Sequence, residues 1–206
     1  LVPAPDGALD LVVVASFAES TDEGALYVWQ GGATLVGTRE PQAILEVAGL
    51  GDDARLGFCG SQGVALLDLD DDGRLDIFAG AAFADEGGVV DSGALYVWRG
   101  GAGLAGRLAP STRLFVPGAS PGDALGNLIG TSGYLRSQCL AFADVTGDGR
   151  PEVLALAPFA DAGGVTDAGA GYVWSPARGF EPGLAPLASL VVPGAAAGDS
   201  LGWAGP

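Results

Sequence analysis

The chain contains no histidine, no lysine and no methionine, and only two cysteines among its 206 residues. Without histidine or lysine, Ser-His, Cys-His and Schiff-base catalysis are excluded, which leaves carboxylates and tyrosine for acid–base chemistry. Long apolar runs are missing too: the longest, residues 11–15, falls far short of the ~20 residues of a membrane helix. These absences argue against membrane insertion and against most enzyme classes.

Positive charge is equally scarce. Nine arginines face 25 acidic residues, which gives a net charge of -16. Nucleic acid is therefore disfavoured as a partner, because its phosphates would be repelled. The large negative net charge suits an extracellular protein in a salty medium. Cys59 and Cys139 are too few for a disulfide framework, and whether they bond to each other stays open at this point.

The residues that are abundant indicate short strands joined by turns. Apolar residues make up 49% of the chain, enough to bury a core, and 36 glycines and 13 prolines occur without a three-residue period. Because β-branched and aromatic residues are also plentiful, the composition predicts an all-β fold.

An acidic stretch from Asp68 to Asp76 reads Asp-Leu-Asp-Asp-Asp-Gly-Arg-Leu-Asp and places carboxylates at positions one, three, five and nine. Carboxylates on alternating residues of a tight turn converge on one point, and Gly73 allows the positive φ that such a turn needs. Hard oxygen ligands favour a hard cation, so the stretch predicts a calcium loop. A solvated acidic turn is the alternative for one isolated loop.

The loop is not isolated, because a second string, Asp144 to Glu152, follows at an offset of 76 residues. Thr146 and Glu152 replace aspartate there but keep oxygen ligands. A third string, residues 2–10, matches only at Asp6, Gly7 and Asp10, so we expect no metal in it. The loop at Asp68 should bind more tightly, since four carboxylates outnumber three and a hydroxyl.

Strand-like segments recur around these loops in a constant order. They are residues 11–16, 25–30 and 43–47, then 64–67, 77–82, 94–98 and 114–116. Each unit thus offers four short strands, one before the metal loop and three after it, which is the pattern of a β-propeller blade with a four-stranded antiparallel sheet. The units span residues 1–57, 58–126 and 127–202, and a fourth begins within 198–206. A β-sandwich would not explain near-identical strings at a constant offset.

The recurring motifs, Gly-Asp-x-Leu-Gly, Asp-x-Asp-x-Asp-Gly-x-x-Asp and Gly-Ala-x-Tyr-Val, resemble FG-GAP repeats, the blades of integrin α-subunit propellers. Leu-Gly stands at residues 56–57, 125–126 and 201–202, where the family has Phe-Gly. The resemblance implies Ca²⁺ bound between the first two strands of a blade, by side chains at positions one, three, five and nine and the backbone carbonyl at seven. Those positions are Asp68, Asp70, Asp72, Arg74 and Asp76, then Asp144, Thr146, Asp148, Arg150 and Glu152.

Just under three blades are present, whereas family propellers usually close with about seven. We therefore expect one partial propeller over residues 1–206 that packs against further blades, from the same polypeptide or from identical copies. The sequence favours the same polypeptide. The resemblance also implies an extracellular or cell-surface location, a structural, adhesion or ligand-binding role, and an unidentified protein or glycan ligand.

Two other functions are weighed. A carboxylate-dependent glycosidase or lyase would have to use the remaining recurrent acids, Asp85, Asp91, Asp161 and Asp167. A catalytic pair is needed once, so recurrence favours turn chemistry in every blade or a second ion, and we expect no enzyme. A lectin-like propeller would use aromatic platforms, for which Trp29, Trp98 and Trp174 are candidates. Their alternation with aliphatic residues is more typical of blade packing.

Overall fold

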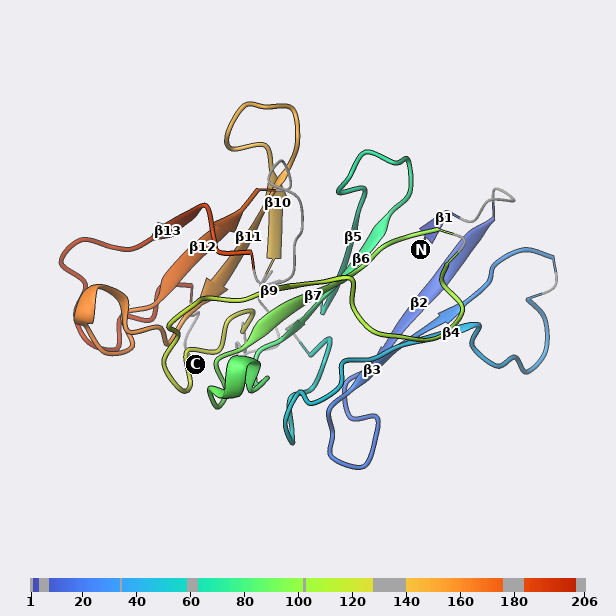
Figure 1. Cartoon of the computed structure of the whole chain (residues 1–206), viewed down its shortest axis with the longest axis horizontal. Coiled ribbons are helices and arrows are strands. Elements are labelled where there is room, and N and C mark those ends of the chain that lie inside the picture. Colours follow the sequence, from blue (N-terminus) through green and yellow to red (C-terminus); the bar gives the residue numbers. More distant parts are fainter. Residues whose placement is uncertain are drawn as a thin grey trace.

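The computed structural model describes residues 8–33, 35–58, 63–101, 103–127, 140–175 and 184–202, and the backbone of residues 2–3. It is all-β. Three sheets lie side by side, and the last two each carry a short 3-10 helix, η1 (Glu86–Gly88) or η2 (Ala162–Gly164) (Figure 1). The expected architecture of successive propeller blades is therefore confirmed.

Each sheet contains four antiparallel strands in sequence order. Blade one consists of β1 (Val2–Pro3), β2 (Leu9–Ala15), β3 (Ala25–Trp29) and β4 (Ala43–Leu45). Blade two consists of β5 (Val64–Leu67), β6 (Asp76–Ala81), β7 (Ala94–Trp98) and β9 (Thr112–Leu114). Blade three consists of β10 (Leu140–Ala143), β11 (Glu152–Ala157), β12 (Ala170–Trp174) and β13 (Ala188–Leu190).

Two details of the sequence-based assignment were wrong. Only three strand segments were identified in unit one, at residues 11–16, 25–30 and 43–47, yet Val2 and Pro3 pair with Asp10 and Leu9 as an additional strand, β1. The closing strand of blade two was expected at residues 114–116 but lies two residues earlier, in β9, because Thr112 is buried and joins the ladder. Both strands are very short, so hydrophobic alternation gave little signal.

A fifth strand in blade one comes from blade two. The connection between β7 and β9 contains β8 (Gly106–Leu108), which pairs in parallel with β4 at the outer edge of blade one. An isolated parallel bridge, Leu114 to Leu184, repeats this contact between blades two and three. The loop between the third and fourth strands of a blade therefore reaches back to cover the edge of the preceding blade.

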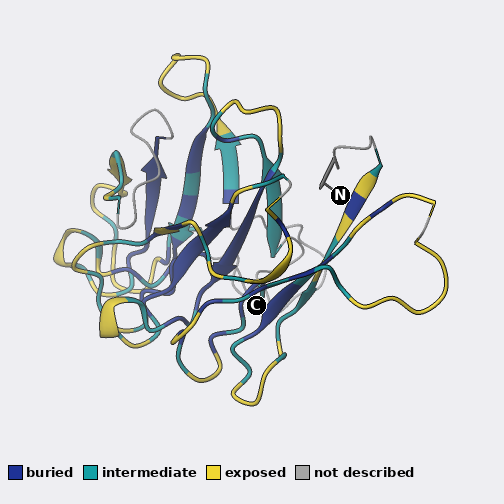
Figure 2. Cartoon of the chain, turned by 45° about the vertical axis from the view of Figure 1, so that its right-hand side comes forward, coloured by how far each residue is buried: buried dark blue, intermediate teal, exposed yellow. Residues whose placement is uncertain are grey.

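The core lies between the sheets rather than inside any one of them. One apolar cluster joins blade one, through residues such as Leu26 and Leu45, to Ile77 and Tyr96 of blade two. A second cluster joins the other face of blade two to blade three. Figure 2 shows the buried residues along the strands and the exposed ones in the loops at both ends. Each blade is thus stabilised mainly by its neighbours.

The Leu-Gly turns connect one blade to the next. Gly57 donates its N–H to the carbonyl oxygen of Gly80 in β6 at 2.7 Å, and Gly126 donates to Leu156 in β11 at 2.8 Å. Just before the second turn, Leu125 runs against Gly93 of the loop between β6 and β7, where a Cβ would lie 2.4 Å from the Leu125 backbone. Glycine is required there because no side chain fits.

Candidate metal centres

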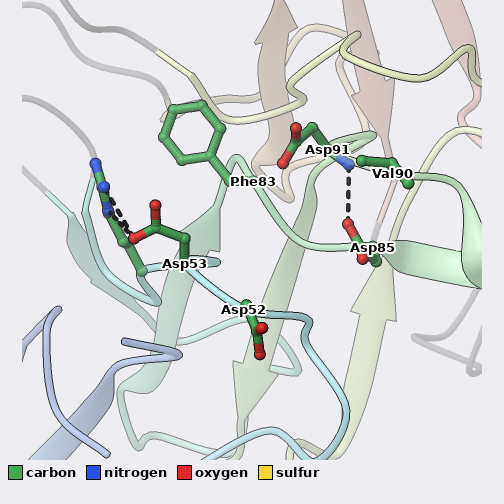
Figure 3. A pocket seen from close by; sticks show the side chains of 7 residues that line it. Asp52, Asp53, Phe83, Asp85, Val90 and Asp91 are labelled. Carbon is green, nitrogen blue, oxygen red and sulfur yellow. Dashed lines mark hydrogen bonds and ion pairs between the residues drawn. The ribbon is translucent and has the colours of Figure 1, made fainter. Parts of the chain in front are cut away.

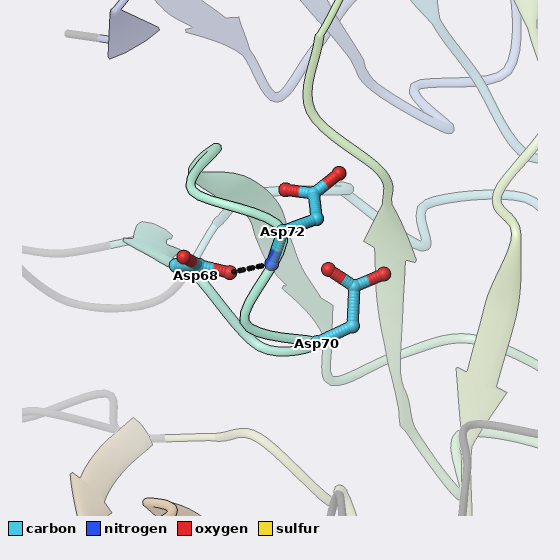
Figure 4. Close-up of side chains that lie close together, drawn as sticks. All are labelled: Asp68, Asp70 and Asp72. Atoms are coloured by element: carbon cyan, nitrogen blue, oxygen red, sulfur yellow. Dashed lines mark hydrogen bonds between the residues drawn. The ribbon is translucent and has the colours of Figure 1, made fainter.

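The predicted calcium loop of blade two connects β5 to β6, at the end of the blade opposite to η1 (Figure 1). Asp68, Asp70 and Asp72 each place one carboxylate oxygen within 4.8 Å of the others. Figure 4 shows the three side chains converging from one turn. Three of the four predicted carboxylates are therefore close enough to share one cation.

Backbone hydrogen bonds hold this turn in shape. Asp68 accepts from the N–H groups of Asp72 at 3.2 Å and Gly73 at 2.9 Å, and Asp72 accepts from the N–H of Arg74 at 2.9 Å. Gly73 has a φ of 83°, as the sequence required. The carboxylates are thus positioned by the loop itself, which reduces the cost of ordering them when an ion binds.

One carboxylate of the cluster, that of Asp70, is only partly satisfied by hydrogen bonds and ion pairs. Its Oδ1 is buried and has no hydrogen-bond partner, while its other oxygen forms an ion pair with Arg99, the residue directly after β7. A buried carboxylate oxygen without a partner is costly, and a bound cation would satisfy it. The donor set, three carboxylates with no nitrogen or sulfur, fits a hard cation such as Ca²⁺.

The loop of blade three, between β10 and β11, repeats the arrangement. Asp144 accepts hydrogen bonds from the N–H groups of Gly147, Asp148 and Gly149 at 2.7, 3.2 and 3.0 Å. Asp148 accepts from the N–H of Arg150 at 2.8 Å. The two loops therefore share one backbone design, which supports treating them as a pair of equivalent sites.

The carboxylates at position nine have a different environment from the other three. Asp76 is buried and accepts hydrogen bonds from the N–H groups of Leu69 at 3.1 Å and Gly100 at 2.9 Å. Burial raises the pKa of Asp76, although both backbone hydrogen bonds act in the opposite direction. This side chain ties the metal loop to the end of β7.

Glu152 has the same role in blade three. Its side chain accepts from the N–H groups of Val145 and Thr146 and from the hydroxyls of Thr146 and Ser175. Burial alone would raise the pKa of Glu152, but these hydrogen bonds outweigh it and hold the pKa below its usual value. Thr146 is thereby directed toward Glu152, a connection that the ligand pattern alone did not reveal.

The position-seven arginines were included only for their carbonyl oxygens, and their side chains make separate contacts. A nitrogen of Arg74 lies 3.8 Å from Asp72 in its own loop. Arg150 reaches from blade three to Asp71 of blade two at 3.1 Å. The two metal loops are therefore connected through an exposed ion pair.

In the first unit only part of the corresponding loop can be compared. Asp6 and Gly7 lie outside the described residues, as do Cys59 and Cys139. Asp10, at position nine, is buried and accepts from the N–H of Gly31 at 2.9 Å. Position nine is thus a buried carboxylate in all three units, including the one for which no metal is expected.

The recurrent acids considered for catalysis bond within their own turns. Asp85 accepts from the N–H of Asp91 at 3.0 Å, and Asp161 accepts from the N–H of Asp167 at 3.1 Å. This pattern favours turn chemistry. Asp85 and Asp91 also line a cavity of about 530 Å³ together with Asp52, Asp53, Arg55, Phe83 and Val90 (Figure 3). Burial raises the pKa of Asp91, and the charges of Asp85 and Asp53 add to the shift.

The recurrent tryptophans pack inside the blades. Trp98 and Trp174 are buried, and Trp29 is half-buried. Each indole N–H donates at 3.0 Å to the carbonyl oxygen ten residues later, in the loop between the third and fourth strands of its own blade. The expectation of blade packing is supported for Trp98 and Trp174, because buried rings offer no open platform for a sugar.

A comparison with known families agrees with this geometry. The FG-GAP repeat model matches residues 60–98 and 140–174. Each match contains one metal loop and ends with the third strand of its blade. No curated protein matches the chain.

The two matches support assigning blades two and three to the FG-GAP repeat family, and such repeats indicate a propeller-type module of the integrin α kind. Repeats of this family are typical of extracellular or surface proteins, and they are usually non-enzymatic. Within the described ranges, no helix has the length and apolar character needed to cross a bilayer.

Proposed function

We propose that this chain is a calcium-stabilised, extracellular propeller module with a structural, adhesion or ligand-binding role and no catalytic activity. The observation that carries the proposal is the convergence of Asp68, Asp70 and Asp72, with a buried carboxylate oxygen left without a partner. The matching hydrogen bonds around Asp144 extend it to a second loop.

The physical role of the ion is to offset repulsion within each loop. Two carboxylates about 4 Å apart repel by roughly 4 kcal/mol at an effective dielectric constant near 20. A bound Ca²⁺ would replace this repulsion by attraction between the cation and its ligands. The ligands would be Asp68, Asp70 and Asp72 in blade two, and Asp144, Thr146 and Asp148 in blade three. Asp76 and Glu152 contribute by fixing each loop to the following strand.

The same chemistry supports the proposed extracellular location. Loops of this kind with micromolar to millimolar dissociation constants stay largely empty at resting cytosolic calcium but fill outside the cell. Each filled site contributes about 2.7 kcal/mol of stability when free Ca²⁺ is 100 times the dissociation constant. The large excess of acidic residues is compatible with this environment.

Thermal unfolding in excess Ca²⁺ and in excess chelator tests the proposal. Wild type should melt at a clearly higher temperature with Ca²⁺, and Asp70→Asn should lose part of that shift. Asp71→Asn is the matched control, because Asp71 is an exposed acid of the same loop outside the carboxylate cluster. A melting temperature that is unchanged by chelator would refute the calcium assignment and the argument for location.

A further inference from the structure

Two buried side-chain oxygens have no hydrogen-bond partner in the part of the chain that the structure describes. One belongs to Asp70 in the acidic loop of blade two, and the other is Oδ1 of Asp123. Asp123 is only 6% exposed and lies just before the Leu-Gly turn that leads from blade two to blade three. Because a buried carboxylate oxygen without a partner is costly, it indicates a ligand that would satisfy it.

The backbone holds Asp123 at the junction between blades two and three, at the end of the blades that carries η1 and η2 (Figure 1). Its neighbours Gly122 and Ala124 donate hydrogen bonds to carbonyl oxygens of the loop between β6 and β7, at 2.9 and 3.0 Å. The second carboxylate oxygen of Asp123 accepts from the N–H of Ser120 at 2.9 Å. The carboxylate is therefore fixed in place before any ligand binds, which lowers the cost of binding.

Blade three brings two further acids to this junction, Asp161 and Asp167, from the loop between β11 and β12. Burial raises the pKa of Asp123, and the charges of Asp161 and Asp167 add to the shift. The backbone N–H groups of Ser120 and Asp161 act in the opposite direction. The charge of Asp123 also adds to the burial that raises the pKa of Tyr172 in β12. Carboxylates from two blades thus act on one another at this junction.

The junction between blades one and two offers a comparison, because there the chain itself supplies positive charge. Arg113 lies 3.6 Å from Glu86, which also accepts a hydrogen bond from the hydroxyl of Tyr96 at 2.9 Å. Arg55 lies 2.9 Å from Asp53, at the cavity shown in Figure 3. Two guanidinium groups therefore partly neutralise the acids of this junction.

At the junction between blades two and three, both arginines are replaced by neutral residues, and one neutral residue is replaced by the buried carboxylate. From the first junction to the second, the replacements are Arg55 by Ala124, Arg113 by Ser189 and Ala54 by Asp123. Within the described ranges, no arginine forms an ion pair with Asp123, Asp161 or Asp167. The negative charge of the second junction is therefore not neutralised by the chain, which favours a cation from solution.

We propose that the junction between blades two and three binds a divalent metal ion through Asp123, separately from the two acidic loops. Oδ1 of Asp123 is the buried ligand, and Asp161 supplies a second carboxylate from the next blade. Oxygen ligands select a hard cation such as Ca²⁺. In the described part of the chain, only the acidic loop of blade two has three carboxylates within 4.8 Å of one another. Water must therefore complete the coordination at the junction, and we expect a lower affinity than in that loop.

Equilibrium dialysis of the whole chain against Ca²⁺ counts the bound ions and tests this proposal. Wild type should bind one ion more than Asp123→Asn. Asp199→Asn is the matched control, because Asp199 has the same position before the next Leu-Gly turn but is exposed. It accepts the equivalent backbone hydrogen bond, from the N–H of Ala196 at 2.7 Å. Equal counts for wild type and Asp123→Asn would overturn the proposal, as would the same loss in Asp199→Asn.

Asp70→Asn separates this site from the acidic loops. If the loop of blade two binds Ca²⁺, Asp70→Asn should lose that ion and retain the one at the junction, and the chain with both substitutions should lose two. If the loops bind no Ca²⁺, Asp70→Asn should match wild type while Asp123→Asn still loses one ion. The proposal for the junction and the proposal for the loops can therefore fail independently.

Ser189→Arg tests the role of charge without changing a ligand. Ser189 is exposed and pairs across the sheet with Tyr172, as Arg113 pairs with Tyr96, so the substitution restores the arginine of the first junction. Calorimetry in a chain with Asp70→Asn and Asp144→Asn, which disable both loops, should show Ca²⁺ binding weakened by up to roughly fivefold. Unchanged binding would show that the ion lies elsewhere.

Melting curves in excess chelator verify that each variant is folded. Without a metal ion, Asp123→Asn should be at least as stable as wild type, because it removes a buried charge whose Oδ1 has no partner in the described ranges. In saturating Ca²⁺ the order should reverse, since only wild type gains stability from the ion at the junction. An Asp123→Asn chain that gains as much stability from Ca²⁺ as wild type would overturn the proposal.

Discussion

Arg99 should weaken calcium binding at the loop of blade two, and replacing it should tighten binding. The guanidinium forms an ion pair with Asp70, one of the three converging carboxylates, in the region where a cation would be attracted. The equivalent residue in blade three is Ser175, which donates a hydrogen bond to Glu152 and brings no positive charge. A bound ion must therefore displace or tolerate an arginine in one loop only.

The structure limits the size of this effect. Arg99 is 61% exposed and Asp70 is 29% exposed, so solvent screens the pair. Exposed ion pairs contribute about 0–1 kcal/mol. With tenfold in affinity per 1.4 kcal/mol, Arg99→Ser should lower the dissociation constant of this loop by up to roughly fivefold. The ion pair with Arg99 therefore reduces the advantage in calcium affinity that the loop at Asp68 was expected to gain from its fourth carboxylate. That this loop binds Ca²⁺ more tightly than the loop at Asp144 stays a prediction.

Calorimetry on a chain with a single working loop measures the effect directly. Asp144→Asn disables the loop of blade three. The dissociation constant for Ca²⁺ of the Asp144→Asn chain is then compared with that of the chain that carries both Asp144→Asn and Arg99→Ser. Arg107→Ser is the matched control, because Arg107 is similarly exposed and pairs with Glu46, remote from the metal loop. Equal affinities for the Arg99→Ser chain and its parent, or weaker binding after the substitution, would refute the reasoning.

Four further substitutions can be assessed by chemical denaturation. Gly93→Ala should destabilise by more than about 2 kcal/mol, because its Cβ would overlap backbone atoms, whereas Gly87→Ala, with a similar positive φ but open space, should lose only about 1 kcal/mol. In excess chelator, Asp123→Asn should stabilise by about 1 kcal/mol at neutral pH. Burial raises the pKa of Asp123, so this gain should vanish as the pH falls through that pKa. Trp174→Phe should cost about 1 kcal/mol by leaving the part-buried carbonyl of Leu184 without its donor.

Much of the fold could be predicted because the sequence of each repeat indicates its own strands and loops. The strand order and the positions of both acidic loops follow from strings such as Ala94–Trp98 and Asp68–Asp76, which recur at fixed offsets. The strand β8 could not be predicted in this way. Its three residues, Gly-Arg-Leu, show no alternation, and its partner β4 lies in another blade.

The role of position nine could not be predicted from the sequence pattern either. A carboxylate at this position can serve as a calcium ligand or as a hydrogen-bond acceptor that fixes the loop to the rest of the blade. Both Asp76 and Glu152 fit the spacing of a calcium ligand. The distinction depends on donors supplied by residues remote in the chain, such as Gly100 and Ser175. A pattern of nine residues carries no information about those donors.

The chemistry of these donors predicts that amide substitutions at position nine will differ between blades. Both hydrogen-bond donors to Asp76 are backbone N–H groups, which cannot reverse, so Asp76→Asn directs an NH₂ group at one of them. One oxygen of Glu152 faces two hydroxyls, which can rotate and accept from the NH₂ group of Glu152→Gln. In excess chelator, Asp76→Asn should cost about 1–3 kcal/mol of unfolding free energy and Glu152→Gln clearly less. No loss for Asp76→Asn without metal would show that position nine acts through the ion alone, and equal losses would refute the distinction between backbone and hydroxyl donors.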